Sequence, residues 1–125
     1  MSMNATTEVD LVGQCASETV SVRYWSSSGG QADFARGAMF SPHGQGFVVL
    51  PSTAAGGTLS RIRPVLTPGS MVTTIKNTVD QVVTEYGVAP MRGRSISQRA
   101  RSLIAITHPR FRDELTAGAK EIGYI

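Results

Sequence analysis

The feature of the sequence that most constrains the fold is a change of pattern near residue 95. Before that point, short apolar runs rich in β-branched residues alternate with glycines and prolines, which is typical of short strands joined by turns. After it, apolar residues recur at the spacing of amphipathic helices. The pattern predicts an α/β domain with an open, mostly parallel sheet flanked by helices and a helical C-terminus.

The first part of the chain carries the predicted strands. A helix is predicted to open on the glycine pair Gly29-Gly30 and to run to Phe40, because adjacent glycines mark a turn. The apolar run 47–50 is closed by Pro51 and predicts a buried strand. The other predicted strands are residues 9–12, 20–25, 59–65, 71–75 and 79–83.

The last third predicts two helices. Ser95 and Gln98 have the spacing of a capping box, and the residues Ile96, Ala100, Leu103 and Ile104 then share one face. Pro109 ends this helix and can serve as the first residue of the next one. In the second helix Phe111, Leu115 and Ile122 share a face, Asp113 and Glu114 lie in the first turn, and Gly123 stands where a C-terminal cap glycine belongs.

Composition narrows the possible functions. The 125 residues suit one domain, and the net charge of +3 permits an acidic ligand, such as a nucleotide or a CoA phosphate, without demanding one. Cys15 is the single cysteine, so no internal disulfide can form, which fits a reducing compartment. No apolar run reaches the roughly 20 residues of a membrane span, and no signal peptide is recognisable. We therefore expect a cytoplasmic protein that does not bind a membrane.

Six arginines lie between residues 92 and 112 and raise the alternative of nucleic-acid binding. A single-strand binder would interleave aromatic residues, and only Phe111 lies among these arginines. We expect a solvated helix face instead, formed by Arg92, Arg94, Arg99, Arg101, Arg110 and Arg112. Asp33 and Arg36 are expected to pair on a helix surface. The two histidines, His43 and His108, are isolated, so no metal site is expected.

Two segments could carry chemistry. Adjacent glycines at Gly29-Gly30, followed by Gln31 and a helix, could hold an oxyanion with backbone amides, or could be an ordinary turn. Glu85 follows the run Val82-Val83, so a carboxylate would stand at the carboxyl end of a strand, where open α/β sheets bind ligands. It could be a nucleophile, a base or a positioning group, or simply a solvated loop residue. The small residues of 52–57 would allow the close approach of a substrate, but they suit a flexible surface loop equally well.

Nine segments, taken in order, add a resemblance. They are residues 8–14, 29–38, 50–53, 56–57, 60–66, 82–87, 92–93, 99–100 and 105–115. Over about residues 4 to 125 the chain resembles the C-terminal domain of the acetyl-CoA hydrolase/transferase family, notably its 4-hydroxybutyrate CoA-transferase-like members. Nine ordered segments are far more specific than a single glycine pair.

The resemblance implies an enzyme that moves CoA between an acyl-CoA and a small carboxylate of the acetate, butyrate or 4-hydroxybutyrate class. The reaction would pass through a glutamyl-CoA thioester. Gly30 would give its amide to the oxyanion and Glu85 would line the site, with Gly29, Gly30, Gln31 and Glu85 around CoA. No metal or other cofactor is implied beyond CoA as substrate.

The nucleophilic glutamate of the family lies upstream of the part that residues 1–125 resemble. The resemblance therefore implies that 1–125 is one domain of a larger two-domain enzyme, inactive alone, completed by an N-terminal half and forming a homo-oligomer. Some relatives carry a lysine before the second glycine pair, where this chain has Ala55; Arg61 or Lys76 could compensate. The competing hypotheses are a non-catalytic CoA- or partner-binding module, an acyl-CoA hydrolase, and a nucleic-acid module.

Overall fold

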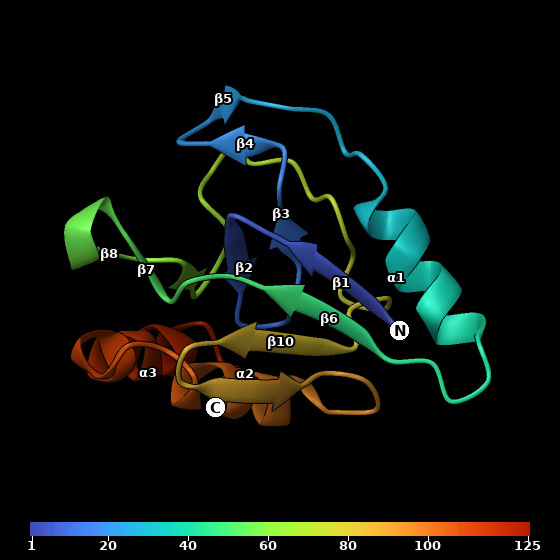
Figure 1. The fold of residues 1–125 in the computed structure, drawn as a ribbon. Coiled ribbons are helices and arrows are strands. Elements are labelled where there is room, and N and C mark those ends of the chain that lie inside the picture. Colours follow the sequence, from blue (N-terminus) through green and yellow to red (C-terminus); the bar gives the residue numbers. More distant parts are fainter.

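The computed structural model describes residues 1–125, and its main element is a four-stranded sheet (Figure 1). The strands are β1 Ser2–Ala5, β6 Gly46–Val49, β10 Gln81–Thr84 and β11 Gly87–Pro90, in the order β1-β6-β10-β11. The first three run parallel and β11 is antiparallel to β10. The predicted α/β architecture with a mostly parallel sheet is confirmed.

Smaller sheets fill the space beneath one face of the main sheet. A three-stranded sheet is formed by β3 Cys15–Ala16, β2 Glu8–Asp10 and β9 Ile62–Arg63. Two hairpins follow, β4 Thr19–Val20 with β5 Arg23–Tyr24, and β7 Thr53–Ala54 with β8 Leu59–Ser60 around the 3-10 turn η1 Ala55–Gly57.

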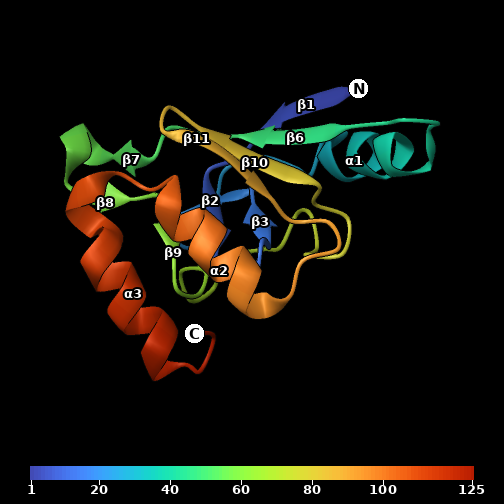
Figure 2. The ribbon, with the colours of Figure 1, turned by 90° about the horizontal axis from the view of Figure 1, so that it is seen from below.

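All the helices lie on the same side of the main sheet (Figure 2). They are α1 Gln31–Phe40, α2 Ile96–Ala105, the 3-10 turn η2 Pro109–Phe111 and α3 Arg112–Glu121. The predicted capping box is present, since Ser95 Oγ accepts from Gln98 N at 3.2 Å and Gln98 Oε1 accepts from Ser95 N at 2.9 Å. Gly123 has a φ of +77° and follows α3, as predicted for a cap glycine. No helix is long and apolar enough to cross a membrane.

One hydrophobic core joins the inner face of the main sheet, the three-stranded sheet and the helices α2 and α3. Strand residues Val48, Val82 and Ala89 contribute to it with Leu103 of α2 and Leu115 of α3. These side chains are 3% exposed or less, so α2 and α3 are held in place by burial rather than by helix propensity alone.

Several predicted strands differ in the structure. Residues 20–25 do not form one strand: Ser21 and Val22 have φ values of 48° and 63° and turn the chain into the β4-β5 hairpin. Residues 71–75 form no strand, and only Thr74 makes an isolated bridge, to Cys15. Segment 59–65 splits because Ser60 pairs with β7 whereas Ile62 pairs with β2. The sequence analysis does not predict β1 and β11, because β1 contains no β-branched residue and β11 contains glycine and proline.

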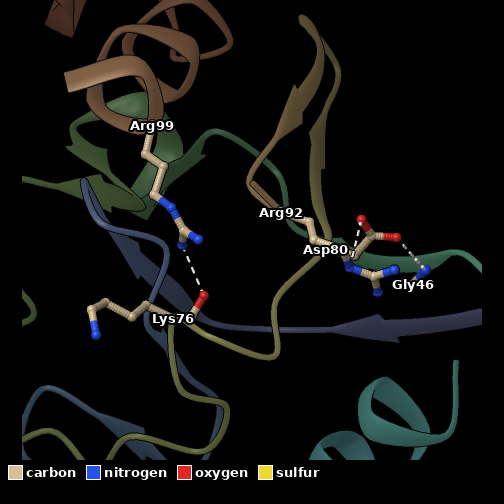
Figure 3. Close-up of polar contacts among 5 residues, drawn as sticks. All are labelled: Gly46, Lys76, Asp80, Arg92 and Arg99. Atoms are coloured by element: carbon tan, nitrogen blue, oxygen red, sulfur yellow. Dashed lines mark hydrogen bonds and ion pairs between the residues drawn. The ribbon is translucent and has the colours of Figure 1, made fainter. Parts of the chain in front are cut away.

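The expected solvated arginine face is wrong for Arg99. Its guanidinium is buried, and Nη1 donates to the Lys76 carbonyl at 2.8 Å (Figure 3). Nη1 also donates to the Val12 carbonyl at 3.0 Å, and Nε donates to the Arg94 carbonyl at 3.1 Å. Burial lowers the pKa of Arg99. Arg99, which was expected at the surface, thus attaches α2 to two loops.

The expected Asp33–Arg36 pair does not form. The one ion pair in the structure joins Arg92 Nε to Asp80 Oδ1 at 3.5 Å (Figure 3). The other oxygen of Asp80 accepts from Gly46 N at 3.0 Å, so this carboxylate ties the start of β6 to the turn after β11.

Candidate active site at the carboxyl edge of the sheet

Three parallel strands end together at one edge of the main sheet. The last residues in register are Ala5 of β1, Val49 of β6 and Val83 of β10. Glu85 comes two residues after Val83, and Ser52 comes three residues after Val49. Open α/β sheets bind their ligands at this carboxyl edge.

Glu85 is held by a single buried neighbour. Glu85 Oε2 accepts from the amide of Ser52 at 2.8 Å, and Oε1 accepts from the Ser52 hydroxyl at 2.5 Å. Ser52 has no solvent exposure, whereas Glu85 is exposed. The carboxylate is therefore held by a buried residue, while Glu85 itself stays accessible to solvent.

The environment of Glu85 favours its charged form. Desolvation, the largest effect, raises the pKa, but the hydrogen bond from the Ser52 hydroxyl, the backbone hydrogen bonds and the nearby His108 outweigh it and lower the pKa overall. A carboxylate of this kind is a poor proton donor near neutral pH and a stable acceptor, which suits a positioning role.

The segment after α2 packs behind Glu85. Thr84 Oγ1 donates to the Ile106 carbonyl at 2.6 Å and accepts from Tyr86 N at 3.1 Å. The Tyr86 ring meets His108 edge to face at 5.6 Å between centroids, and the Arg112 guanidinium lies 5.7 Å from the centre of the Tyr86 ring. His108 and Arg112, assigned from the sequence to isolated or solvated positions, thus adjoin the candidate site.

Gly29 and Gly30 form the turn at which α1 begins. Gly29 has a φ of +55°, which favours glycine, whereas Gly30 is the N-cap with a φ of −99°. No side chain caps the helix, so its first amides remain available to an anion. A β-carbon on Gly30 would stand 2.8 Å from the ring of Phe34, which is itself 64% exposed.

Gln31 links α1 to the rest of the edge. Its Nε2 donates to the Ala5 carbonyl at 2.8 Å, and its Oε1 accepts from Ser17 Oγ at 2.8 Å and Thr74 Oγ1 at 3.1 Å. The side chain is buried, so it anchors the first turn of α1 at the end of β1. That Gln31 contacts CoA stays a prediction. Its side chain is engaged by these three hydrogen bonds, and its backbone forms the N-terminus of α1.

Gly30 and Glu85 therefore share one edge but stand two strands apart. Neighbouring strands are about 4.8 Å apart, which puts the end of β1 about 10 Å from the end of β10. Two surface hollows of about 150 and 180 Å³ occur elsewhere, around the β7-β8 hairpin, and neither is lined by Gly30 or Glu85. The candidate residues thus lie on an open surface.

The loop that follows Ser52 has an unusual backbone. Ala55, Gly56 and Gly57 have φ values of 51°, 66° and 87°, so three successive residues are left-handed. Arg61 Nη1 donates to the Thr7 carbonyl at 3.0 Å and its Nε to Thr53, and it thereby fixes the base of this loop. Lys76 bonds Asn77 at the surface. No cluster of three His, Cys, Asp or Glu side chains is close enough to hold a metal ion.

Comparison with known proteins shows the family to which the chain belongs. A model of the acetyl-CoA hydrolase/transferase C-terminal domain matches residues 1–119, and the chain belongs to this family. It is 55% identical over 125 residues to succinyl-CoA:cyclohexane-1-carboxylate CoA transferase of Geobacter metallireducens, covering 100% of the chain and 29% of that protein. It is 50% identical over 115 residues to 4-hydroxybutyrate coenzyme A transferase of Clostridium kluyveri, covering 92% of the chain and 27% of that protein.

Solved structures have the same fold. The crystal structure of RipA from Yersinia pestis matches with a TM-score of 0.90 and 45% identity, over 98% of this chain and 28% of that one. A 4-hydroxybutyrate CoA-transferase from Porphyromonas gingivalis matches with a TM-score of 0.77 and 42% identity, over 96% and 26%. The chain thus spans less than a third of the length of these relatives.

Proposed function

We propose that this chain is the C-terminal part of a CoA-transferase that moves CoA from an acyl-CoA to a small carboxylate. The observation that supports this most is the edge at which the α1 N-terminus and the anchored Glu85 carboxylate are presented together. Relatives named for succinyl, cyclohexane-1-carboxylate and 4-hydroxybutyrate substrates support a carboxylate acceptor.

The proposed reaction uses a glutamate in the region that precedes this domain in the family. Its carboxylate attacks the acyl-CoA carbonyl and expels CoA thiolate, which leaves a mixed anhydride. The thiolate then attacks the glutamyl carbonyl and releases the first carboxylate, giving a glutamyl-CoA thioester. A second carboxylate repeats these steps in reverse and leaves with CoA, so the glutamate is regenerated.

Gly30 acts on the charge that develops in these steps. Each attack places negative charge on a former carbonyl oxygen, and a backbone amide at a helix N-terminus stabilises such an oxygen. Glu85 positions groups rather than attacking, because its pKa is lowered and both its oxygens are engaged by Ser52. The Ser52 contacts hold the Glu85 carboxylate in a fixed orientation.

A chimera tests the proposal. In the Geobacter metallireducens transferase, the matching C-terminal region is replaced by this chain, and CoA transfer from succinyl-CoA to short carboxylates is measured. The chimera should transfer CoA, and the 125-residue chain alone should not. A chimera that only hydrolyses acyl-CoA would make the chain part of a hydrolase, and one that binds CoA without turnover would make it a binding module.

The position of the nucleophile is tested separately. The glutamyl-CoA thioester is trapped with borohydride or hydroxylamine, and the modified peptide is identified by mass spectrometry. The label should fall outside this chain, and Glu85→Gln should lower turnover but leave the label in place. A label on Glu85 would contradict the proposed mechanism.

A further inference from the structure

One face of the main sheet is apolar and uncovered. Side chains at paired positions share a face, and the outer face consists of two rows across the four strands. The first row is Met3, Phe47, Gln81 and Pro90, and the second is Ala5, Val49, Val83 and Val88. Met3 and Val88 are 66% and 51% exposed, and no element of the chain crosses this face (Figure 2).

The composition of this outer face is that of an interior. Every one of its residues except Gln81 is apolar, and none is charged. A sheet face designed for water carries polar side chains, whereas mostly parallel sheets are covered on both faces. A contiguous apolar patch of this kind marks a surface that another segment covers.

The helices of the chain cannot supply that cover. α1 and α2 pack on the inner face, where Val48, Val82 and Ala89 are buried beneath them. All three α-helices lie on this inner side in Figure 2. The chain thus covers the inner face of its main sheet and leaves the outer face exposed.

We infer that the outer face docks against the N-terminal region that precedes this domain in family members, within one polypeptide. The inference rests on the proposed function. More than two thirds of the Geobacter metallireducens relative lies outside the matched part, and the matching family model is that of a C-terminal domain. The absence of charge on the outer face fits an apolar segment rather than a nucleic acid or an anionic surface.

Two further observations favour this occupant. β1 is the first element and an edge strand, and Figure 2 places the N-terminus at the rim of the outer face, so a preceding segment enters there. The outer face also ends at the carboxyl edge that carries Glu85 and the start of α1. A segment packed on Val49 and Val83 would therefore adjoin these groups, which line neither of the two hollows around the β7-β8 hairpin.

Thiol labelling tests the docking without any need for activity. Cys15 is fully buried, and burial raises the pKa of its thiol, so the native cysteine is silent toward maleimide. Val88→Cys reports on the outer face. Ile75→Cys is the matched control, because Ile75 lies in the loop between β9 and β10 and is 54% exposed against 51% for Val88.

Both variants should label at similar rates in the 125-residue chain. In the chimera Val88→Cys should label at least about tenfold more slowly, which corresponds to about 1.4 kcal/mol for uncovering the thiol, while Ile75→Cys should be unchanged. An active chimera with an unprotected Val88→Cys would overturn the docking and leave the proposed function intact. An inactive chimera with a protected Val88→Cys would support the docking and count against the function.

A second measurement does not require a fusion. The N-terminal region of the Geobacter metallireducens relative is co-expressed with this chain, and co-purification is measured for Val83→Glu and for the control Ile75→Glu. Loss of binding by Val83→Glu alone supports the docking, and binding by both variants overturns it. Concentration-dependent protection of Val88→Cys in the chain alone would assign the outer face to a second copy and would also overturn it.

Discussion

The buried Arg99 guanidinium should be a major source of stability for this chain. It joins α2 to the loop at Val12, 87 residues away in sequence, and to the loop at Lys76, 23 residues away (Figure 3 shows the Lys76 contact). Replacement by Met keeps an unbranched apolar stem but removes every donor. The Val12 carbonyl is then buried without a partner, while the carbonyls of Lys76 and Arg94 are partly exposed and can turn to water.

The size of the effect follows from these contacts. An unsatisfied buried carbonyl costs about 1–3 kcal/mol, and the two partly exposed bonds add about 0.5–1 kcal/mol each. Removing the desolvation cost of the guanidinium offsets part of this, so we expect a loss of about 3 kcal/mol. A 125-residue chain unfolds with an entropy of about 0.26 kcal/mol/K, so Tm should fall by about 11 °C.

Thermal and urea unfolding of the chain measure this loss. Arg101→Met is the matched control, because Arg101 is exposed on the same helix, and it should change stability by less than about 0.5 kcal/mol. Arg99→Lys should fall between the two, since one ammonium group cannot reach three carbonyls with the geometry of a guanidinium. Equal stability of Arg99→Met and Arg101→Met would refute the role assigned to Arg99.

Three further predictions concern the candidate site and the core. Ser52→Ala removes a hydrogen bond to the charged form of Glu85, and this bond helps to lower the pKa of Glu85 in the intact site, so that pKa should rise. The acidic limb of the chimera's pH–rate profile should therefore move to higher pH. An unmoved limb would contradict the coupling between Ser52 and Glu85. Gly30→Val adds a branched side chain beside the amide that would hold the oxyanion, so turnover should fall by about 10²–10³-fold. The circular dichroism spectrum should stay unchanged, since a φ of −99° suits any residue and the exposed Phe34 ring can move aside. Turnover within about twofold of the parent would contradict the amide role. Cys15 should react with a disulfide reagent only on unfolding, because burial raises the pKa of its thiol, and rapid labelling of the folded chain would contradict its burial.

Local signals in the sequence were sufficient for the helices. The Ser95–Gln98 capping box, Pro109 and Gly123 act within a few residues, so the structure has each of them in its predicted role. The strands depend more on distant partners. Residues 71–75 have the composition of a strand, but only Thr74 finds a partner. By contrast β1 has no β-branched residue, yet it pairs with β6 along its whole length.

The position of the candidate site could be predicted from the sequence, but the residues that hold its groups in place could not. Glu85 follows a β-branched run, so its place at the carboxyl end of a strand could be predicted. Its partner Ser52 lies 33 residues away in sequence, and nothing local indicates that the two meet. The contacts of Arg99 could not be predicted either, because its acceptors are backbone carbonyl groups, which every residue has.

The groups exposed at the carboxyl edge are each held by a buried polar side chain behind them. Ser52 holds Glu85, Gln31 holds the start of α1, and Thr84 holds the turn at Tyr86. These three side chains are 0%, 5% and 7% exposed, and all their bonds are to groups of the chain itself. Burying them costs free energy that their hydrogen bonds must offset, so they fix geometry rather than maximise stability. An edge held in this way, beside an exposed apolar face, is the arrangement expected if the proposed docking segment supplies the rest of the site.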